Sequence, residues 1–312
     1  NHLQDQVLAL SEQQQQRYFG HLIEDDSPSS IQKYTEQLLR TRYQVVDEQL
    51  KQNSWIDEDQ FLEHYYTAFT QQPYLKHSTI TLDEAVIRLF NRHLFIEKLP
   101  VPSLAFLLID EIQDYTPAQC TLLLTLFPRA AFTMVGDENQ AIFNSAIDFR
   151  EIQEIFEANN RSVTRYDLRT SYRSSGEITK LFAKLANHTT MSIMPVRPAG
   201  EPPRFIRFEN ELEWLATITP FIKKGRQYTI LTKSHKEAAF LEEYLKGQTN
   251  QLPFPVYSID IAKGREFDHV ILYDVSNEQF YTTQDKRILY TLLSRGMESM
   301  LVTYKKELSA FF

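Results

Sequence analysis

The chain has 312 residues, of which 42% are hydrophobic and 24% charged, and its net charge is −8. This composition is typical of a globular protein, and the length allows two domains, each with its own core. No apolar run approaches the roughly 20 residues that cross a bilayer, so the sequence predicts no membrane contact. The single cysteine, Cys120, excludes an intrachain disulfide framework and fits a cytoplasmic protein.

The beginning of the chain does not resemble a targeting signal. Residues 1–16 lack the basic segment and the long apolar run of a secretory signal, and the first residue is Asn1 instead of Met. We therefore expect residue 1 to lie inside a longer protein. The short glutamine run at residues 13–16 indicates a solvated helix face.

Charge is distributed unevenly along the chain. Residues 1–164 contain 24 acidic and 12 basic side chains, a balance of −12, whereas residues 165–312 contain 17 acidic and 21 basic side chains, a balance of +4. Lys and Arg make most contacts with phosphate groups, so the second part is the better candidate for binding nucleotide or nucleic acid. Ordinary variation of the surface is the alternative explanation.

The first third of the chain is predicted to be helical. From Leu3 to about Ala68 the sequence is rich in Gln, Glu, Leu and Tyr, and apolar residues such as Tyr34 and Leu38 recur at helical spacing. Thr81, followed by two acids, is typical of the capped start of another helix, which we expect to continue through Leu94.

The pattern changes to strands and helices from Leu104 onward. Short apolar runs predict parallel strands, with the first of them buried, and helical composition predicts the segments between them. The expected strands are 104–109, 131–135, 204–208, 229–232, 256–259, 269–273 and 300–304, and the expected helices are 117–126, 176–187, 236–246 and 286–295. This alternation predicts an α/β protein in three layers with mainly parallel sheets, and a boundary between two α/β units near residues 162–169.

Acidic side chains follow the first of these strands. Asp110, Glu111 and Asp114 lie where a parallel sheet binds its ligands, beyond the carboxyl end of a strand. Carboxylates can hold Mg²⁺, which prefers oxygen ligands, and a second carboxylate can activate a water molecule for attack on a phosphate. Because acids often terminate strands, this signal alone is weak.

Four further segments strengthen the interpretation of these acids as a metal site. LLIDEIQDYTPAQ is similar to motif II of the UvrD/Rep-like superfamily 1 helicases, and VGDENQAIF to motif III. DLRTSYRSS resembles motif IV, SIDIAKGREFDHVIL motif V and RILYTLLSRGMESML motif VI. All five occur in the order found in that family and together cover roughly residues 100–305. The resemblance implies two RecA-like units, the first of them incomplete in this chain, and an ATP-dependent DNA helicase or translocase.

The resemblance also implies a role for each matching residue, with ATP and Mg²⁺ as cofactors. Asp110 and Glu111 would be the metal ligands, with Glu111 also orienting or deprotonating water. Gln140 would sense the γ-phosphate, while Arg173 and Arg295 would reach that phosphate as arginine fingers. The nucleoside would be bound by Tyr172, stacked on adenine, by Glu266, on the ribose hydroxyls, and by Gly264 in the turn of motif V.

The sequence departs from the family at three points. A phosphate-binding loop needs GxxxxGK[ST], yet none of the eight glycines is followed by lysine. We expect the loop upstream of residue 1, and no ATP hydrolysis by these residues alone. Residues 144–146, after Phe143, lack the tryptophan that often follows motif III, which weakens the case for stacking on single-stranded DNA. The short stretch between motifs IV and V is more like the helicase IV/HelD-type branch.

These departures leave the domain and partner assignments as follows. Residues 1–100 would be the tail of an insertion in the first motor domain, residues 101–164 the second half of that domain, and residues 165–312 the second RecA-like domain. Single-stranded or duplex DNA is the expected partner of a helicase motor. The alternatives are a HelD-type remodelling ATPase that binds RNA polymerase and a non-catalytic interaction module.

Overall fold

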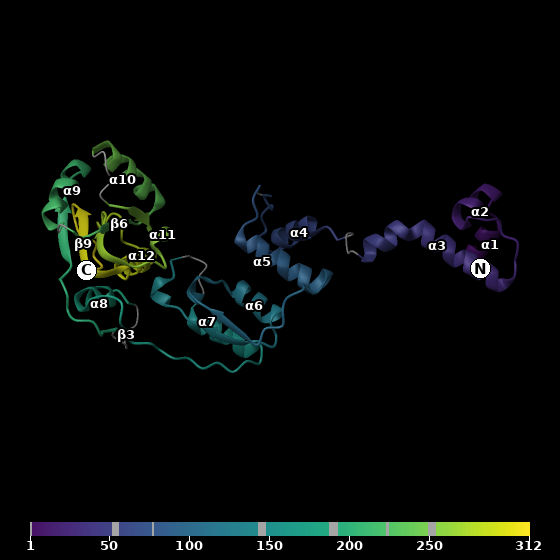
Figure 1. Ribbon diagram of the computed structural model, residues 1–312, viewed down its shortest axis with the longest axis horizontal. Coiled ribbons are helices and arrows are strands. Elements are labelled where there is room, and N and C mark those ends of the chain that lie inside the picture. The colour runs from purple at the N-terminus through teal and green to yellow at the C-terminus, as the bar shows by residue number, and fades with distance from the viewer. Residues whose placement is uncertain are drawn as a thin grey trace. The chain divides into compact units, whose positions relative to one another are not determined.

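The computed structural model describes residues 2–51, 56–76, 78–142, 148–186, 193–222, 225–248 and 254–312. Contacts divide the chain into two compact units, Asn1–Pro102 and Ser103–Phe312 (Figure 1). The first unit is helical, and the second contains the strands. Among the described residues, no helix is both long and apolar enough to cross a membrane.

The first unit begins with three helices: α1 (His2–Leu8), α2 (Glu12–Phe19) and α3 (Pro28–Lys51). Ser11 caps α2 by accepting a hydrogen bond from the Gln14 amide, and Gly20 ends it in the left-handed conformation. Val7, Phe19 and Leu38 form the buried core among these helices. The predicted helical character of this region is confirmed.

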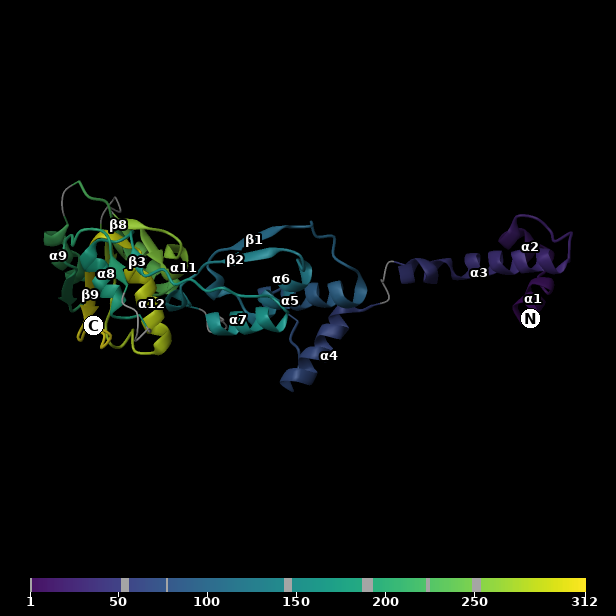
Figure 2. The same ribbon diagram turned by 90° about the horizontal axis from the view of Figure 1, so that it is seen from below.

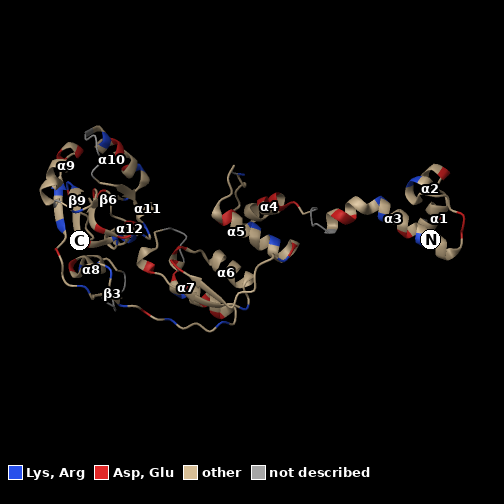
Figure 3. Ribbon diagram, in the orientation of Figure 1, with Lys and Arg blue, Asp and Glu red and all other residues tan. Residues whose placement is uncertain are grey.

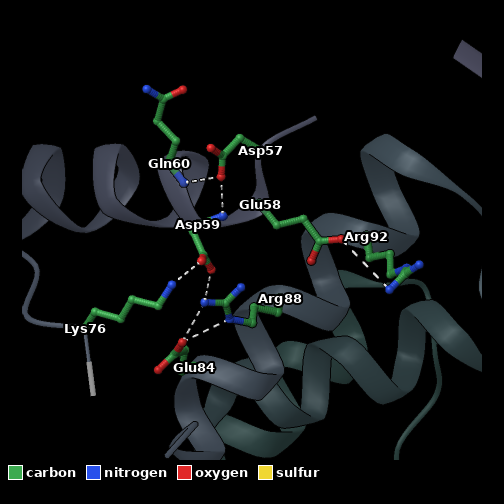
Figure 4. A network of polar contacts seen from close by, with 8 residues as sticks. All are labelled: Asp57, Glu58, Asp59, Gln60, Lys76, Glu84, Arg88 and Arg92. Atoms are coloured by element: carbon green, nitrogen blue, oxygen red, sulfur yellow. Dashed lines mark hydrogen bonds and ion pairs between the residues drawn. The ribbon is translucent and has the colours of Figure 1, made fainter. Parts of the chain in front are cut away.

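Two more helices, α4 (Glu58–Thr70) and α5 (Leu82–Asn91), are joined by an ion pair. Asp57 caps α4, and Thr81 caps α5 as predicted. Arg88 on α5 binds Asp59 of α4 at 2.6 Å and Glu84 of its own helix at 2.8 Å (Figure 4). The predicted helix through Leu94 ends its regular part at Asn91 and continues as a π-helical turn, η1 (Arg92–Ile96).

The second unit opens with two parallel strands, β1 (Phe106–Ile109) and β2 (Ala131–Met134), connected through α6 (Pro117–Leu126). The ends of α6 agree with the predicted range, because Thr116 and Gln119 form a capping box at its start. Helices α6 and α7 (Phe149–Ala158) share a core with Ile109 and lie on the same side of the two strands (Figure 2).

The prediction that the first strand is buried is wrong for its outer face. Phe106 is 72% exposed and Leu108 78% exposed, whereas Ile109 is buried. Successive side chains of a strand point to opposite faces of its sheet. Because α6 and α7 cover one face of β1, the alternate residues Phe106 and Leu108 remain on the open face.

A five-stranded parallel sheet forms the centre of the remaining chain. Its strand order is β5-β9-β8-β6-β7. The strands are β5 (Arg204–Phe208), β6 (Tyr228–Thr232), β7 (Val256–Ser258), β8 (Phe267–Leu272) and β9 (Gly296–Lys305). All five predicted strands in this part occur, most with ends shifted by one to four residues. The predicted α/β class with parallel sheets is confirmed.

Helices cover both faces of this sheet. The helices are α8 (Gly176–Ala183), α9 (Glu211–Ile218), η4 (Thr219–Phe221), α10 (His235–Gln248), α11 (Ile259–Ala262) and α12 (Thr283–Leu293). Side chains of α8, α11 and α12 form one core with Val302, and side chains of α9 and α10 form another with Ile230. Each fully buried aliphatic side chain contributes about 1.5–3 kcal/mol, so the sheet and its helices form a stable support for the loops at its edges.

Three further features complete the second unit. Two short strands, β3 (Thr170–Ser171) and β4 (Met194–Pro195), pair in parallel outside the main sheet. Helix α8 ends at Ala183, and position 187, the expected end of this helix, lies outside the described residues. Residues 162–169, the predicted boundary between two α/β units, contain no helix or strand, and both flanking parts belong to one compact unit.

Cys120 provides a test of the core around α6. Its thiol is buried, and burial together with the charge of Glu151 raises its pKa to about 11. The ordinary thiol pKa is about 8.5, so at pH 8 we expect native Cys120 to react with Ellman's reagent at least about 100-fold more slowly than in denaturing urea. Equal rates in buffer and in urea would show that this core is open.

Candidate functional site

A tight turn follows β1 and carries the predicted acidic residues. Glu111 adopts the left-handed conformation, with φ of 51°. This conformation directs the chain into η2 (Ile112–Asp114), and the Asp110 carboxylate accepts a hydrogen bond from the Glu111 amide at 2.8 Å. The Gln113 amide group in turn donates to the Glu111 carboxylate at 2.5 Å. The acidic turn is therefore held by its own side chains.

Gln113 also joins this turn to the end of β2. Its side-chain oxygen accepts a hydrogen bond from the Asp137 amide at 3.0 Å, and the residue is fully buried. Gly136 leaves room for this bond, because a β-carbon at that position would lie 2.2 Å from the Gln113 oxygen. The glycine of the VGD segment thus permits the close approach of the two strand ends.

The end of β2 places Gln140 opposite the second sheet. Asp137 caps η3 (Glu138–Gln140) by accepting a hydrogen bond from the Asn139 amide, and its other carboxylate oxygen accepts one from the Gln140 side chain at 3.1 Å. The Gln140 side-chain oxygen accepts a hydrogen bond from Arg295 at 2.6 Å. This bond joins two predicted site residues that are far apart in sequence.

Arg295 lies at the amino end of β9 and is only 2% exposed. Its guanidinium group also donates to the carbonyl oxygens of Thr291 and Arg265 and to the Ser294 hydroxyl. Burial lowers its pKa, as does the charge of Arg173, while Glu111, Glu266 and Asp137 oppose this effect. The side chain is therefore a desolvated cation held close to acidic groups from both parts of the unit. These parts are the one that contains β1 and β2 and the one that contains the five-stranded sheet.

Sequence reasoning missed two residues that join the same two parts. The Lys263 ammonium binds the Asp114 carboxylate at 2.6 Å, and the Tyr290 hydroxyl donates to the Asp137 carboxylate at 2.9 Å. Burial and the nearby Asp137 charge raise the pKa of Tyr290. Lys263 belongs to the predicted motif V turn and Tyr290 to an apolar helix, and neither pattern signals a partner about 150 residues away.

The remaining predicted residues lie at the border of this network. The Arg173 guanidinium forms an ion pair with the Glu266 carboxylate, and both side chains are partly exposed. Tyr172 is 69% exposed. Gly264 has φ of +77° with open space around it, so it allows the turn before β8 without a close contact. Among the described residues, the hydrogen bonds and ion pairs around Gln140 and Arg295 do not include Tyr172 or Gly264.

Charges of both signs surround Arg295. Carboxylates come from the ends of β1 and β2, as Glu111 and Asp137, and from the turn before β8, as Glu266, while Arg173 is a second cation. Figure 3 shows that both signs occur throughout the unit. Opposite charges that face each other favour the approach of the two parts.

Asp110 and Glu111 are the candidate metal ligands. Among the described residues, no group of three or more His, Cys, Asp or Glu side chains could hold a metal ion. Mg²⁺ commonly takes one or two carboxylates and completes its shell with water and phosphate oxygens. Two adjacent acids at a strand end fit that need, and their role as Mg²⁺ ligands stays a prediction.

One known family model matches the first part of the chain. Residues 1–151 match the UvrD/REP helicase N-terminal domain. This part of the chain is therefore similar to the UvrD/REP helicases. The matched residues include the turn at Asp110 and the segment up to Gln140, so the acidic half of the site lies in the part that resembles that domain.

A curated DNA helicase is a distant relative of this chain. DNA helicase IV of Escherichia coli (strain K12) is 22% identical over 231 residues, which are 64% of this chain and 34% of the relative. The chain thus spans about a third of the length of the curated relative that it matches. The branch within the family, including the HelD-type assignment, stays a prediction.

Three solved helicase structures are similar to parts of this chain. The C-terminal domain of a possible DNA helicase from Lactobacillus plantarum is 25% identical, with 45% of this chain and 91% of that chain covered and a TM-score of 0.37. The PRRSV helicase is 16% identical, with 63% and 34% covered and a TM-score of 0.39. The arterivirus nonstructural protein 10 helicase, solved with DNA, is 16% identical, with 63% and 38% covered and a TM-score of 0.36. At such scores these likenesses add no support.

The residue roles implied by the family resemblance remain predictions. The structure brings Gln140 and Arg295 into direct contact and pairs Arg173 with Glu266. Residues 143–147, which include the end of motif III, lie outside the described residues. The expectation about stacking on single-stranded DNA concerns these residues and stays a prediction.

Substitution of Gly136 tests the packing beneath the site. Gly136→Ala would displace the buried Gln113 side chain and break its bond to the Asp137 amide, so we expect a loss of about 1–3 kcal/mol in the free energy of unfolding by urea. Gly247→Ala is the matched control, because open space surrounds this helical glycine and alanine is the better helix former. A stable Gly136→Ala variant would show that Gln113 can move without cost.

Proposed function

We propose that the chain is part of an ATP-dependent superfamily 1 DNA helicase or translocase motor. The observation that carries this proposal is the bond between Gln140 and Arg295, which connects the acidic ends of one parallel sheet to a buried cation at the second sheet. A nucleotide site shared by two α/β parts uses such an arrangement, because closure brings opposite charges together around the phosphates.

In the proposed chemistry the acidic residues bind the metal ion and water, the arginines bind the phosphates, and Tyr172 and Glu266 bind the nucleoside. Asp110 and Glu111 would hold Mg²⁺, which would neutralise charge on the phosphates. Glu111 orients water and accepts its proton, since its carboxylate is fixed by Gln113. Arg173 and Arg295 stabilise negative charge on the phosphate oxygens. Tyr172 offers an exposed ring for stacking on adenine, and the Glu266 carboxylate accepts hydrogen bonds from ribose hydroxyls.

Gln140 is proposed to connect hydrolysis to movement of the two parts. Its side-chain amide donates to Asp137 and its oxygen accepts from Arg295, so it responds to the positions of both. A phosphate between the carboxylates and Arg295 would compete for the same guanidinium group. Exchange of this partner during each cycle would open and close the site.

The 312 residues contain no GxxxxGK[ST] segment, so a phosphate-binding loop would have to come from outside them. We expect the purified 312-residue chain to show no ATP hydrolysis above the rate of a Glu111→Gln variant, in a coupled assay with MgATP. A rate that Glu111→Gln abolishes would show that these residues hydrolyse ATP without such a loop.

The catalytic role of Glu111 is tested in the longest gene product that contains these residues. Glu111→Gln preserves the size of the side chain but removes the base, so we expect kcat for ATP to fall about 100-fold or more, with little change in nucleotide binding. Glu278→Gln is the control, because Glu278 forms an exposed ion pair with Lys306, just beyond the end of β9. Equal kcat values for the Glu111→Gln variant and the unmodified protein would refute the proposed site.

The two candidate partners are separated in the same gene product. A DNA motor should bind single-stranded DNA with an affinity that falls as salt increases, because Lys and Arg release counterions from phosphates. Retention of RNA polymerase on the immobilised protein, without such DNA binding, would instead support the remodelling ATPase. Binding of neither, combined with no ATP hydrolysis, would favour a non-catalytic interaction module.

A further inference from the structure

Lys263 binds two groups at the site and has no role in the chemistry proposed above. Its ammonium lies 2.6 Å from the Asp114 carboxylate and 3.0 Å from the main-chain carbonyl oxygen of Gln140. The Lys263 side chain is only 11% exposed and that of Asp114 23%. One cation from the turn between α11 and β8 therefore contacts the turns that follow both β1 and β2.

The Gln140 contact places Lys263 beside the bond between Gln140 and Arg295. Arg295 binds the side chain of Gln140, and Lys263 binds its main chain. The orientation of the Gln140 side chain depends on where its backbone is held. A charge-assisted hydrogen bond at the carbonyl is about twice as strong as a neutral one, so Lys263 is well suited to fix that position.

The local backbone around Lys263 does not need the ammonium group. The Lys263 amide donates to the Ile259 carbonyl oxygen, and the Arg265 amide donates to that of Ala262. Gly264 supplies the left-handed residue of the turn, with φ of +77°. Main-chain hydrogen bonds and glycine thus form the end of α11, which leaves the long side chain free to reach the other part of the unit.

We propose that Lys263 is a positioning residue, which clamps the turns after β1 and β2 so that Gln140 stays within reach of Arg295. The contacts of Lys263 with Asp114 and Gln140 do not depend on the proposed function. The effect of Lys263 on ATP hydrolysis rests on the proposed function. Because the ion pair with Asp114 is partly buried, the Lys263 bond is screened less by salt than a surface pair.

The clamp is tested by amide hydrogen exchange in the 312-residue chain. Lys263→Met removes the charge and keeps an unbranched side chain. We expect exchange of the amides of Gln140 and Ala141, which are bonded within η3, to become about tenfold faster. Lys306→Met is the matched control, since it removes a lysine from an exposed ion pair with Glu278 and should leave these amides unchanged.

Two other variants separate the clamp from a general loss of folding. Lys263→Arg retains a cationic donor and should restore most of the protection at Gln140 and Ala141. Asp114→Asn should weaken it, and addition of Lys263→Met to Asp114→Asn should have less effect than Lys263→Met alone, because the two residues share one interaction. Faster exchange confined to residues 259–265, or unchanged exchange at Gln140 and Ala141, would overturn the proposal.

The measurement is independent of hydrolysis. If Glu111→Gln leaves ATP turnover unchanged while Lys263→Met still speeds exchange at Gln140, the clamp stands and the proposed function fails. In the gene product that hydrolyses ATP, Lys263→Met should lower kcat by about tenfold with KM nearly unchanged, because a mispositioned Gln140 acts after nucleotide is bound. Normal exchange with intact turnover would remove the clamp and leave the motor proposal in place.

Discussion

The guanidinium group of Arg295 is buried at the amino end of β9, where water cannot compensate its charge. Moving an unpaired cation into such a place costs several kcal/mol, so its hydrogen bonds must be made by the protein. Ser294, Thr291 and Arg265 supply three acceptors from the same side, and Gln140 supplies a fourth from the end of the other sheet. The hydrogen bond to Gln140 is made only when the two parts of the unit are together, and the geometry of the site depends on this requirement.

The two sheets contribute opposite ends of their strands to the site. Asp110 and Asp137 follow the carboxyl ends of β1 and β2, whereas Glu266 and Arg295 precede the amino ends of β8 and β9. Ligands of parallel sheets usually bind at carboxyl ends, and only the first part follows that rule here. Glu266 and Arg295 therefore lie in turns that enter strands, and Gly264 forms the turn before β8.

The sequence predicted most of the elements, because their local signals are strong. The capping box at Thr116 and the apolar strands of the second sheet each depend on neighbours in sequence, and α6 agrees with its predicted range. The exposure of Phe106 and Leu108 could not be predicted, since it depends on which faces of the two-stranded sheet the helices cover. Short elements such as β3 and α11 lack enough residues to show a period.

Prediction of the site was limited in the same way. Motif resemblance identified Gln140 and Arg295 separately, and only the fold shows that they touch. Lys263 lies in the segment that resembles motif V, and nothing in its local sequence indicates a carboxylate 149 positions earlier. Contacts of this kind arise from the arrangement of two sheets, which a single sequence does not encode in any one segment.

Glu111 has a strained, left-handed backbone conformation and a carboxylate that accepts a hydrogen bond from Gln113. A left-handed residue other than glycine costs about 1 kcal/mol, so a glycine at position 111 would relieve strain in the turn. It would also remove the carboxylate that Gln113 holds. Because Gln113 is buried, an amide left without this partner would cost about 1–3 kcal/mol, so the bond made by the Glu111 side chain offsets the strain of its own backbone.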